Sequence, residues 1–221
     1  MRLLLISSST VHGFGYLDHP EPEMRAFLGA GRRVAFVPFA FHDHDAYTTK
    51  VRERLARMDL DVVSIDEIDH ADAVFVGGGN TFRLLKTLYE RDLLTPIRDR
   101  VRAGLPYLGS SAGTVITAPT MKTTNDMPIV QPPSFDALGL VTYQINPHYL
   151  DPDPQSTHKG ETREERIREF HEENETPVVG LREGSILRVE DGITTLLGEK
   201  TARIFRRGSE PAEMGPGEID I

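Results

Sequence analysis

The sequence predicts one α/β domain built on an open, doubly wound and mostly parallel β-sheet. Two observations lead to this fold class. Short apolar runs alternate with polar segments of helical period, and the runs are continuously apolar, as in strands covered by helices on both faces. A length of 221 residues suits a single domain of this kind. Reactive groups are then expected beyond the carboxyl ends of the strands.

Each apolar run in the first part of the chain is expected to be a strand. The five strands are expected at residues 3–6, 34–39, 62–65, 73–76 and 105–108. Three helices are expected between them, at residues 45–58, 81–89 and 93–103. In the first of these helices, Tyr47, Val51 and Leu55 form one apolar stripe. Repeated strand–helix–strand units predict parallel pairing with right-handed crossovers.

The second half of the sequence has a different character. Residues 119–160 are rich in Pro, Asn, Asp and Thr and are expected to be mostly loop, with a short strand at 140–144. A charged helix is expected at 161–173. Further strands are expected at residues 178–181, 185–189, 194–197 and 202–205. Residues 208–221 are expected to be a flexible tail of the single catalytic domain, which spans residues 1–221.

Composition and charge exclude several classes of protein. Acidic residues outnumber basic ones by 34 to 25, for a net charge of −9. An acidic field repels phosphate backbones, so no nucleic acid partner is expected. The lack of cysteine excludes a disulfide framework, a thiol nucleophile and cysteine-based zinc sites. No apolar run approaches the roughly 20 residues of a membrane span, and the apolar start is too short for a signal peptide. The expected location is the cytoplasm.

The strongest candidate for chemistry is the segment Gly109-Ser110-Ser111-Ala112-Gly113, which follows an expected strand and precedes an expected helix at 112–117. This is the G-x-S-x-G pattern of a nucleophile elbow in its required context. The glycines allow a sharp turn that exposes the Ser111 hydroxyl at a helix N-terminus, where backbone N–H groups can stabilise an oxyanion. The alternative is a glycine–serine turn without a catalytic role.

A serine nucleophile needs a general base, and that base needs an orienting carboxylate. Among the histidines, His148 is the best candidate because it ends an apolar run and follows the stiffening Pro147. Two carboxylates are candidates for its partner: Asp126, in the loop after the elbow helix, and Glu183, just past an expected strand. The local sequence does not choose between them, and a surface histidine beside solvated carboxylates is the alternative.

A second glycine-rich turn, Gly77-Gly78-Gly79-Asn80, ends one strand and opens the next helix. Three glycines permit close approach of the backbone to a ligand, so N–H groups here can complete an oxyanion hole or cradle a phosphate. The spacing fits neither G-x-G-x-x-G nor a P-loop, which disfavours a dinucleotide site. Asn80 can also act only as a helix cap.

Two charged segments are weaker candidates. His42-Asp43-His44 lacks the aspartate that the H-x-H-x-D metal motif needs, because residue 46 is alanine. A helix start is therefore expected there rather than a metal site. Residues 162–168 are expected to form an exposed helical face with Arg–Glu pairs, although one arginine can instead clamp an anionic substrate.

Several segments together resemble the peptidase E (aspartyl dipeptidase) family of serine peptidases. They are residues 76–82, residues 109–113 with 123–129, and residues 144–148 with 159–164. The start of the chain up to Thr10 also matches, and the resemblance extends from residue 1 to about residue 205. It implies a class I glutamine amidotransferase-like fold with serine in place of that group's cysteine, in agreement with the predicted sheet.

The resemblance implies hydrolysis of dipeptides that have an N-terminal aspartate, without a cofactor or metal. On this chain it implies Ser111 as the nucleophile and His148 as the general base. The third member of the triad is then either Asp126 or Glu183, and the resemblance does not decide between the two.

The resemblance also assigns residues to substrate recognition. It implies an oxyanion hole formed by the N–H groups of Gly79 and Ala112. It implies that Arg163 binds the side chain of the substrate's aspartate, with Asn80 nearby. Ser110 departs from the family pattern, in which a bulky residue precedes the nucleophile, and the histidine-rich loop at 42–44 is a second local difference. Neither difference removes a catalytic group, but both can alter access or rate.

Two alternatives to this function stay open. The same chemistry can act on isoaspartyl, cyanophycin-derived or other acidic peptides, or on esters. The fold can also serve a non-catalytic binding module, whose signature would be a missing nucleophile or base, whereas Ser111 and His148 are both present. The sequence leaves the oligomeric state open, a homodimer included.

Overall fold

The computed structural model describes residues 1–152, 155, 157 and 160–221. Lys159, which belongs to one of the family-like segments, therefore lies outside the described residues. The larger sheet of the described chain contains β1 (Arg2–Ile6), β2 (Arg32–Val37), β3 (Leu60–Ser64), β4 (Ala73–Val76), β5 (Tyr107–Ser110), β8 (Ile186–Glu190), β9 (Ile193–Leu197) and β12 (Gly217–Glu218). A smaller sheet contains β6 (Gln144–Tyr149), β7 (Val178–Arg182), β10 (Ala202–Phe205) and β11 (Ala212–Met214).

The strand order of the larger sheet is β12-β9-β8-β1-β5-β4-β2-β3. Strands β1 to β5 pair in parallel. Strands β8, β9 and β12 extend this parallel unit by antiparallel pairing. The predicted α/β fold with a mostly parallel sheet is therefore confirmed.

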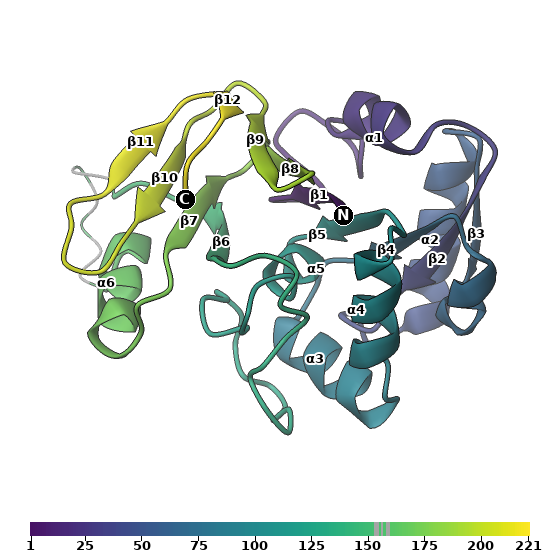
Figure 1. Cartoon of the computed structure of the whole chain (residues 1–221), viewed down its shortest axis with the longest axis horizontal. Helices are drawn as coiled ribbons and strands as arrows, with labels where there is room; N and C mark the ends of the chain where they lie inside the picture. The colour runs from purple at the N-terminus through teal and green to yellow at the C-terminus, as the bar shows by residue number, and fades with distance from the viewer. Residues whose placement is uncertain (153–154, 156, 158–159) are drawn as a thin grey trace.

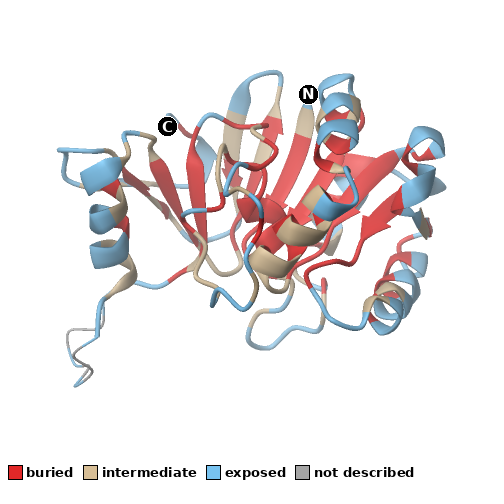
Figure 2. Ribbon diagram, turned by 90° about the horizontal axis from the view of Figure 1, so that it is seen from below, coloured by how far each residue is buried: buried red, intermediate tan, exposed pale blue. Residues whose placement is uncertain are grey.

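Helices cover both faces of the larger sheet. They are α1 (Glu21–Leu28), α2 (His44–Ala56), α3 (Thr81–Glu90), α4 (Leu94–Arg102), the short α5 (Ala112–Val115), and a 3-10 helix at Ile65–His70. Alternate residues of β1 point to opposite faces, as the period of a strand requires. Leu3 and Leu5 pack with α3, α4 and α5, whereas Leu4 and Ile6 pack with α1 and α2. Figure 2 shows the result, with buried residues concentrated on the strands and the exposed residues of the helices facing outward.

The smaller sheet lies beside the larger one, to its left in Figure 1, with α6 (Arg163–Glu173) packed on it. Ile167 of α6 meets Tyr149, Val178 and Phe205 in a separate apolar cluster. The opposite face of this sheet joins the main core, which contains residues of both sheets. The two sheets thus meet along one continuous apolar layer, and chain segments at this junction can contact strands of both.

Local sequence explains where several helices begin. Asp43 accepts a hydrogen bond from the N–H of Ala46 at the start of α2, over 2.9 Å. Thr162 and Glu165 form a reciprocal capping box at the start of α6. The histidine-rich loop at 42–44 is therefore a capped helix start, as the sequence indicates.

Two parts of the second half differ from the prediction. The strand expected at 140–144 instead begins at Gln144 and ends at Tyr149, because Leu140, Val141 and Tyr143 are buried against the core without strand pairing. This shift brings His148 into a strand. The helix α1 is not among the elements expected from the sequence. Two prolines at its start indicate a turn, and its apolar stripe of Met24, Phe27 and Leu28 is short.

The C-terminal residues also differ from the prediction. Residues 208–221 were expected to be a flexible tail, but they contain β11, which pairs with β10, and β12, which pairs with β9. Ile219 is only 7% exposed. Pairing with two strand edges and burial of this side chain hold the segment, despite its proline and glycine content. No described helix has the length and apolar composition of a membrane span.

Candidate active site

Ser111 lies on a sharp turn between β5 and α5. Its φ of 50° is in the left-handed region that favours glycine. A Cβ on Gly109 would lie 2.6 Å from the carbonyl oxygen of Gly113, and one on Gly113 would lie 2.1 Å from the carbonyl oxygen of Val76. Both glycines of the motif are therefore required by close backbone packing, and the turn has the geometry of a nucleophile elbow.

The side chains of Ser111, His148 and Glu183 form a continuous hydrogen-bonded chain. Nε2 of His148 lies 2.9 Å from Oγ of Ser111, and Nδ1 lies 2.7 Å from Oε1 of Glu183. A carboxylate only accepts hydrogen bonds, so Nδ1–H donates to Glu183, which leaves Nε2 free to accept from the serine hydroxyl. The arrangement matches the serine–base–acid geometry required for nucleophilic catalysis.

The backbone around His148 is irregular, and this irregularity points the imidazole toward Ser111. His148 has a φ of 52°, and the pairing of β6 with β7 shifts register between Pro147 and Tyr149. The N–H of His148 donates to Oγ of Ser7 over 3.0 Å. The Ser7 hydroxyl in turn donates to the carbonyl oxygen of Leu181 over 2.8 Å.

Ser7 is a buried residue beside the candidate site that the sequence did not single out. It follows β1 of the larger sheet, is fully buried, and bonds to β6 and β7 of the smaller sheet. Its signal in the sequence is a hydroxyl at the carboxyl end of a central strand, where the site was expected.

Glu183 lies in the turn that carries the chain from β7 in the smaller sheet to β8 in the larger one. The turn is closed by a hydrogen bond from the N–H of Ser185 to the carbonyl oxygen of Arg182, over 3.1 Å. Gly184 supplies the positive φ of 86° that the turn needs. The acid thus reaches His148 from the junction of the two sheets.

Backbone N–H groups approach Ser111 from two segments. A Cβ on Gly78 would lie 3.1 Å from Cβ of Ser111, so the glycine-rich turn passes directly against the nucleophile. Gly79 has a φ of 134°, and a Cβ there would lie 2.7 Å from the carbonyl oxygen of Ala40. The N–H groups of Gly79 and Ala112 find no acceptor among the residues that the structure describes. Both are therefore free to donate to a developing oxyanion.

Asn80 has structural contacts at the start of α3. Its Oδ1 accepts from the N–H of Arg83 over 3.0 Å, which is a helix cap. Its Nδ2 donates to the carbonyl oxygen of Met127 over 2.9 Å. The cap predicted as the alternative for Asn80 is thus present.

Asp126 does not contact His148. Its Oδ2 accepts from the N–H of Thr81 over 2.7 Å, from the hydroxyl of Thr81 over 2.5 Å, and from the hydroxyl of Thr124 over 3.1 Å. Of the two carboxylates that the sequence left open, the structure brings Glu183 to the imidazole and holds Asp126 at the start of α3.

Arg163 is the first residue of α6 and is partly buried. Burial lowers the pKa of its guanidinium, and the nearby charge of Arg166 lowers it further, while Asp126 acts in the opposite direction. Within the described part of the chain, the guanidinium of Arg163 has no ion pair or hydrogen bond. An arginine stays charged under these conditions, so it is a cation available to an anionic ligand.

Ser110, the residue before the nucleophile, is fully buried at the end of β5. Its hydroxyl has no hydrogen-bond partner among the described residues. Its side chain therefore packs in the core beneath the elbow.

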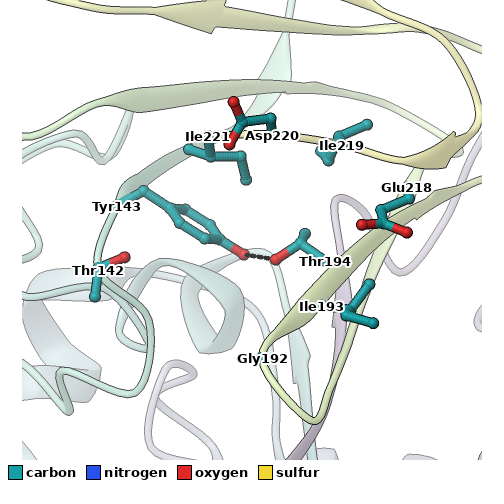
Figure 3. Close-up of a pocket in the computed structure, with 9 residues that line it drawn as sticks. All are labelled: Thr142, Tyr143, Gly192, Ile193, Thr194, Glu218, Ile219, Asp220 and Ile221. Carbon is teal, nitrogen blue, oxygen red and sulfur yellow. Dashed lines mark hydrogen bonds between the residues drawn. The ribbon is translucent and has the colours of Figure 1, made fainter.

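A separate hollow of about 530 Å³ lies between residues 142–143, the β9 hairpin and the C-terminus (Figure 3). The hydroxyl groups of Tyr143 and Thr194 are 3.3 Å apart in its wall. The nine described residues that line it include no histidine, lysine or arginine. This hollow therefore has no imidazole that could act as a general base, and none of Ser111, His148 and Glu183 lines it. Among the described residues, no cluster of His, Asp or Glu side chains is arranged to hold a metal ion.

Comparison with known proteins gives consistent matches over nearly the whole chain. A model of peptidase family S51 matches residues 3–197. Peptidase E of Streptomyces coelicolor is 60% identical over 224 residues, covering 98% of this chain and 92% of that protein. A Drosophila melanogaster protein named "Probable alpha-aspartyl dipeptidase" is 47% identical, covering 97% of this chain and 94% of that protein.

A solved structure shows the same fold. The crystal structure of a peptidase from an acI-B1 actinobacterium superimposes with a TM-score of 0.72 at 15% identity, covering 100% of this chain and 96% of that chain. The architecture agrees with the class I glutamine amidotransferase-like fold that the sequence implies.

Proposed function

Because this chain belongs to peptidase family S51 and is a serine peptidase, we propose that it hydrolyses dipeptides whose N-terminal residue is aspartate. The observation that carries the chemistry is the hydrogen-bonded chain Ser111–His148–Glu183, with distances of 2.9 Å and 2.7 Å. The names of its relatives, peptidase E and alpha-aspartyl dipeptidase, support the choice of substrate.

In the first half of the proposed reaction, the Oγ of Ser111 attacks the peptide carbonyl and its proton passes to Nε2 of His148. The carboxylate of Glu183 stabilises the imidazolium that forms. The N–H groups of Gly79 and Ala112 donate to the oxyanion of the tetrahedral intermediate. The imidazolium then protonates the leaving amine, the C–N bond breaks, and an aspartyl ester of the serine remains.

In the second half, His148 takes a proton from water, which attacks the ester carbonyl of the acyl-enzyme. The second tetrahedral intermediate uses the same oxyanion donors. Its collapse releases aspartate and returns the proton to Ser111. The residues thus return to their starting state without a further reactant.

Arg163 provides the specificity in this proposal. A partly buried guanidinium without a partner in the described chain favours an acidic side chain over a neutral one, since a neutral side chain would leave the cation unpaired. It also provides a local positive charge in a protein whose net charge is −9. The cytoplasmic location predicted from the sequence stays part of the proposal, to be checked by cell fractionation.

The test is a substrate panel of Asp-Leu, Glu-Leu, Leu-Leu and N-acetyl-Asp-Leu, with EDTA present and the Ser111→Ala variant alongside. We expect the wild type to cleave Asp-Leu selectively and the variant, with an unchanged circular dichroism spectrum, to cleave nothing. Cleavage of Leu-Leu at the same rate as Asp-Leu would contradict the specificity, and an active Ser111→Ala variant would contradict the nucleophile.

A further inference from the structure

Tyr47 of α2 packs against the glycine-rich turn that passes the nucleophile. A Cβ on Gly77 would lie 2.5 Å from Oη and 2.8 Å from Cζ of this tyrosine, so only glycine leaves room for the phenol. The next residue, Gly78, is the one whose Cβ would lie 3.1 Å from Cβ of Ser111. Two consecutive residues of the turn thus contact Tyr47 and the nucleophile, directly before Gly79, whose N–H is proposed to donate to the oxyanion.

The hydroxyl of Tyr47 is a polar group that faces the backbone of this turn. Its oxygen accepts a hydrogen bond from the hydroxyl of Tyr16 over 3.4 Å. Burial raises the pKa of Tyr47, while hydrogen bonds from Tyr16 and from the backbone of Gly78 act in the opposite direction. A hydrogen bond that favours the phenolate is donated to its oxygen, so the N–H of Gly78 faces Tyr47. This N–H finds no backbone acceptor in the described part of the chain.

The ring of Tyr47 is held by the core rather than by the turn. The residue is only 6% exposed. Its ring centroid lies 5.1 Å from that of Phe36 in β2 and 4.5 Å from that of Phe41. A closely packed ring has little freedom to move, so its hydroxyl is a fixed point from which a neighbouring loop can be positioned.

A tyrosine that only filled the core would not need this hydroxyl. Phenylalanine offers the same ring without the cost of burying a polar group. The apolar stripe of α2 accounts for the ring of Tyr47 but not for an oxygen beside Gly77 and Gly78. The hydroxyl therefore calls for an explanation in the turn that it contacts.

We propose that the hydroxyl of Tyr47 positions the glycine-rich turn so that the N–H of Gly79 points at the oxyanion. The inference rests on the proposed function and deepens it, because it adds a positioning residue for the same reaction. Tyr47 acts through Gly78 and does not touch the substrate. The oxyanion exists only in the tetrahedral states, so a misplaced donor weakens their binding more than it weakens binding of the substrate.

The experiment compares Tyr47→Phe with Tyr143→Phe. Tyr143 is a matched control, since it is also 6% exposed and its hydroxyl lies 3.3 Å from that of Thr194 (Figure 3). Each variant loses a contact between two hydroxyl groups and keeps its aromatic ring. Circular dichroism and thermal unfolding check that both variants fold.

Two readouts separate positioning of the oxyanion donor from a general structural role. The first is the division of the effect between kcat and KM for Asp-Leu. The second is the inhibition constant Ki of the boronic acid analogue of aspartate, in which boron replaces the α-carboxyl carbon. Oγ of Ser111 bonds to the boron and forms a tetrahedral adduct, which resembles the tetrahedral intermediate and places an oxygen where the oxyanion forms.

We expect Tyr47→Phe to lower kcat for Asp-Leu by about 10- to 100-fold, with KM within about twofold of the wild type. The Ki of the boronic acid should rise by the same factor by which kcat/KM falls, because both report binding of a tetrahedral state. Tyr143→Phe should leave kcat, KM and Ki unchanged.

Gly77→Ala alters the same contact from the side of the turn. The added methyl group would lie 2.5 Å from Oη of Tyr47, so the phenol and the turn must separate. The same loss of kcat and the same rise in Ki are expected. Gly215→Ala is its control, because a Cβ on Gly215 would have no atom within 4 Å.

Two results would overturn the inference while leaving the proposed function intact. One is a Tyr47→Phe variant with the kcat of the wild type. The other is a variant whose kcat falls while the Ki of the boronic acid stays unchanged, since its hydroxyl would then not act on the oxyanion. If Tyr47→Phe does not fold, the same two results in Gly77→Ala overturn the inference. A wild type that does not cleave Asp-Leu would overturn the proposed function itself, and the inference with it.

Discussion

Oε1 of Glu183 lies 2.7 Å from Nδ1 of His148, and this contact joins the turn after β7 to the strand β6 at the junction of the two sheets. Both side chains are partly exposed, at 37% for His148 and 42% for Glu183. The contact fixes the imidazole so that its other nitrogen faces Ser111. Of the two candidate carboxylates, Glu183 is therefore the one that contacts the imidazole.

Glu183→Gln should lower kcat for Asp-Leu by about 10²- to 10⁴-fold with little change in KM, because an amide neither selects the reactive imidazole tautomer nor stabilises the imidazolium. Steady-state kinetics check this prediction. The exposed Glu199 provides the control, since Glu199→Gln removes the same charge from a side chain with no hydrogen bond or ion pair among the described residues and should be neutral. An unchanged kcat in Glu183→Gln would remove Glu183 from the triad.

Arg163→Gln should lower kcat/KM for Asp-Leu by about 10- to 100-fold, the effect of losing a charged hydrogen bond, and change Asn-Leu much less. The control is Arg166→Gln, because Arg166 is 53% exposed and pairs with Glu161 over 3.5 Å. Kinetics on the two isosteric dipeptides give the result. Equal losses on Asp-Leu and Asn-Leu would show that Arg163 does not interact with the side-chain carboxylate of the substrate.

Ser7→Ala should reduce the free energy of unfolding by about 1–3 kcal/mol and lower kcat, since it leaves the buried Leu181 carbonyl and the N–H of His148 without a partner. Ser8→Ala is a matched control. Ser8 is equally buried, but its hydroxyl has no partner among the described residues. Urea unfolding and kinetics should show Ser8→Ala near wild type, and equal behaviour of the two variants would contradict the role given to Ser7.

Glu213→Gln should destabilise the protein at neutral pH and have less effect in acid. Hydrogen bonds from Arg182, at 3.0 Å to each carboxylate oxygen, lower the pKa of Glu213. The folded state therefore binds the carboxyl proton less readily than the unfolded state. The stabilisation is fully present above the ordinary carboxyl pKa near 4 and is lost as pH falls through the lowered pKa of the folded state.

Urea unfolding of wild type and Glu213→Gln between pH 7 and pH 3 tests this dependence, with the exposed Glu210→Gln as control. The difference between wild type and Glu213→Gln should shrink steadily with falling pH, while Glu210→Gln should follow wild type throughout. Identical unfolding of wild type and Glu213→Gln at pH 7 would show that β11 does not depend on its contact with Arg182.

The parallel part of the sheet could be predicted from the sequence because strands that are buried on both faces consist almost entirely of apolar residues. β4 is buried at all four positions and coincides with its predicted bounds. The edge strands of the two sheets were harder to predict. β11 and β12 are short and contain few apolar residues, so they form only because strands β10 and β9 offer them backbone partners.

The turn that carries the candidate nucleophile Ser111 could be predicted from the sequence alone, because an elbow is local. Two glycines, a strand and a helix within a few residues dictate where the hydroxyl of Ser111 points. Its partners are not local. His148 and Glu183 are 35 residues apart, and they meet only through the parallel pairing of β6 with β7 and the crossing of the chain from one sheet to the other. Asp126 and Glu183 are equivalent as isolated carboxylates, and only tertiary structure holds one at the start of α3 and brings the other to the imidazole, because hydrogen bonds act over about 3 Å whatever the separation along the chain.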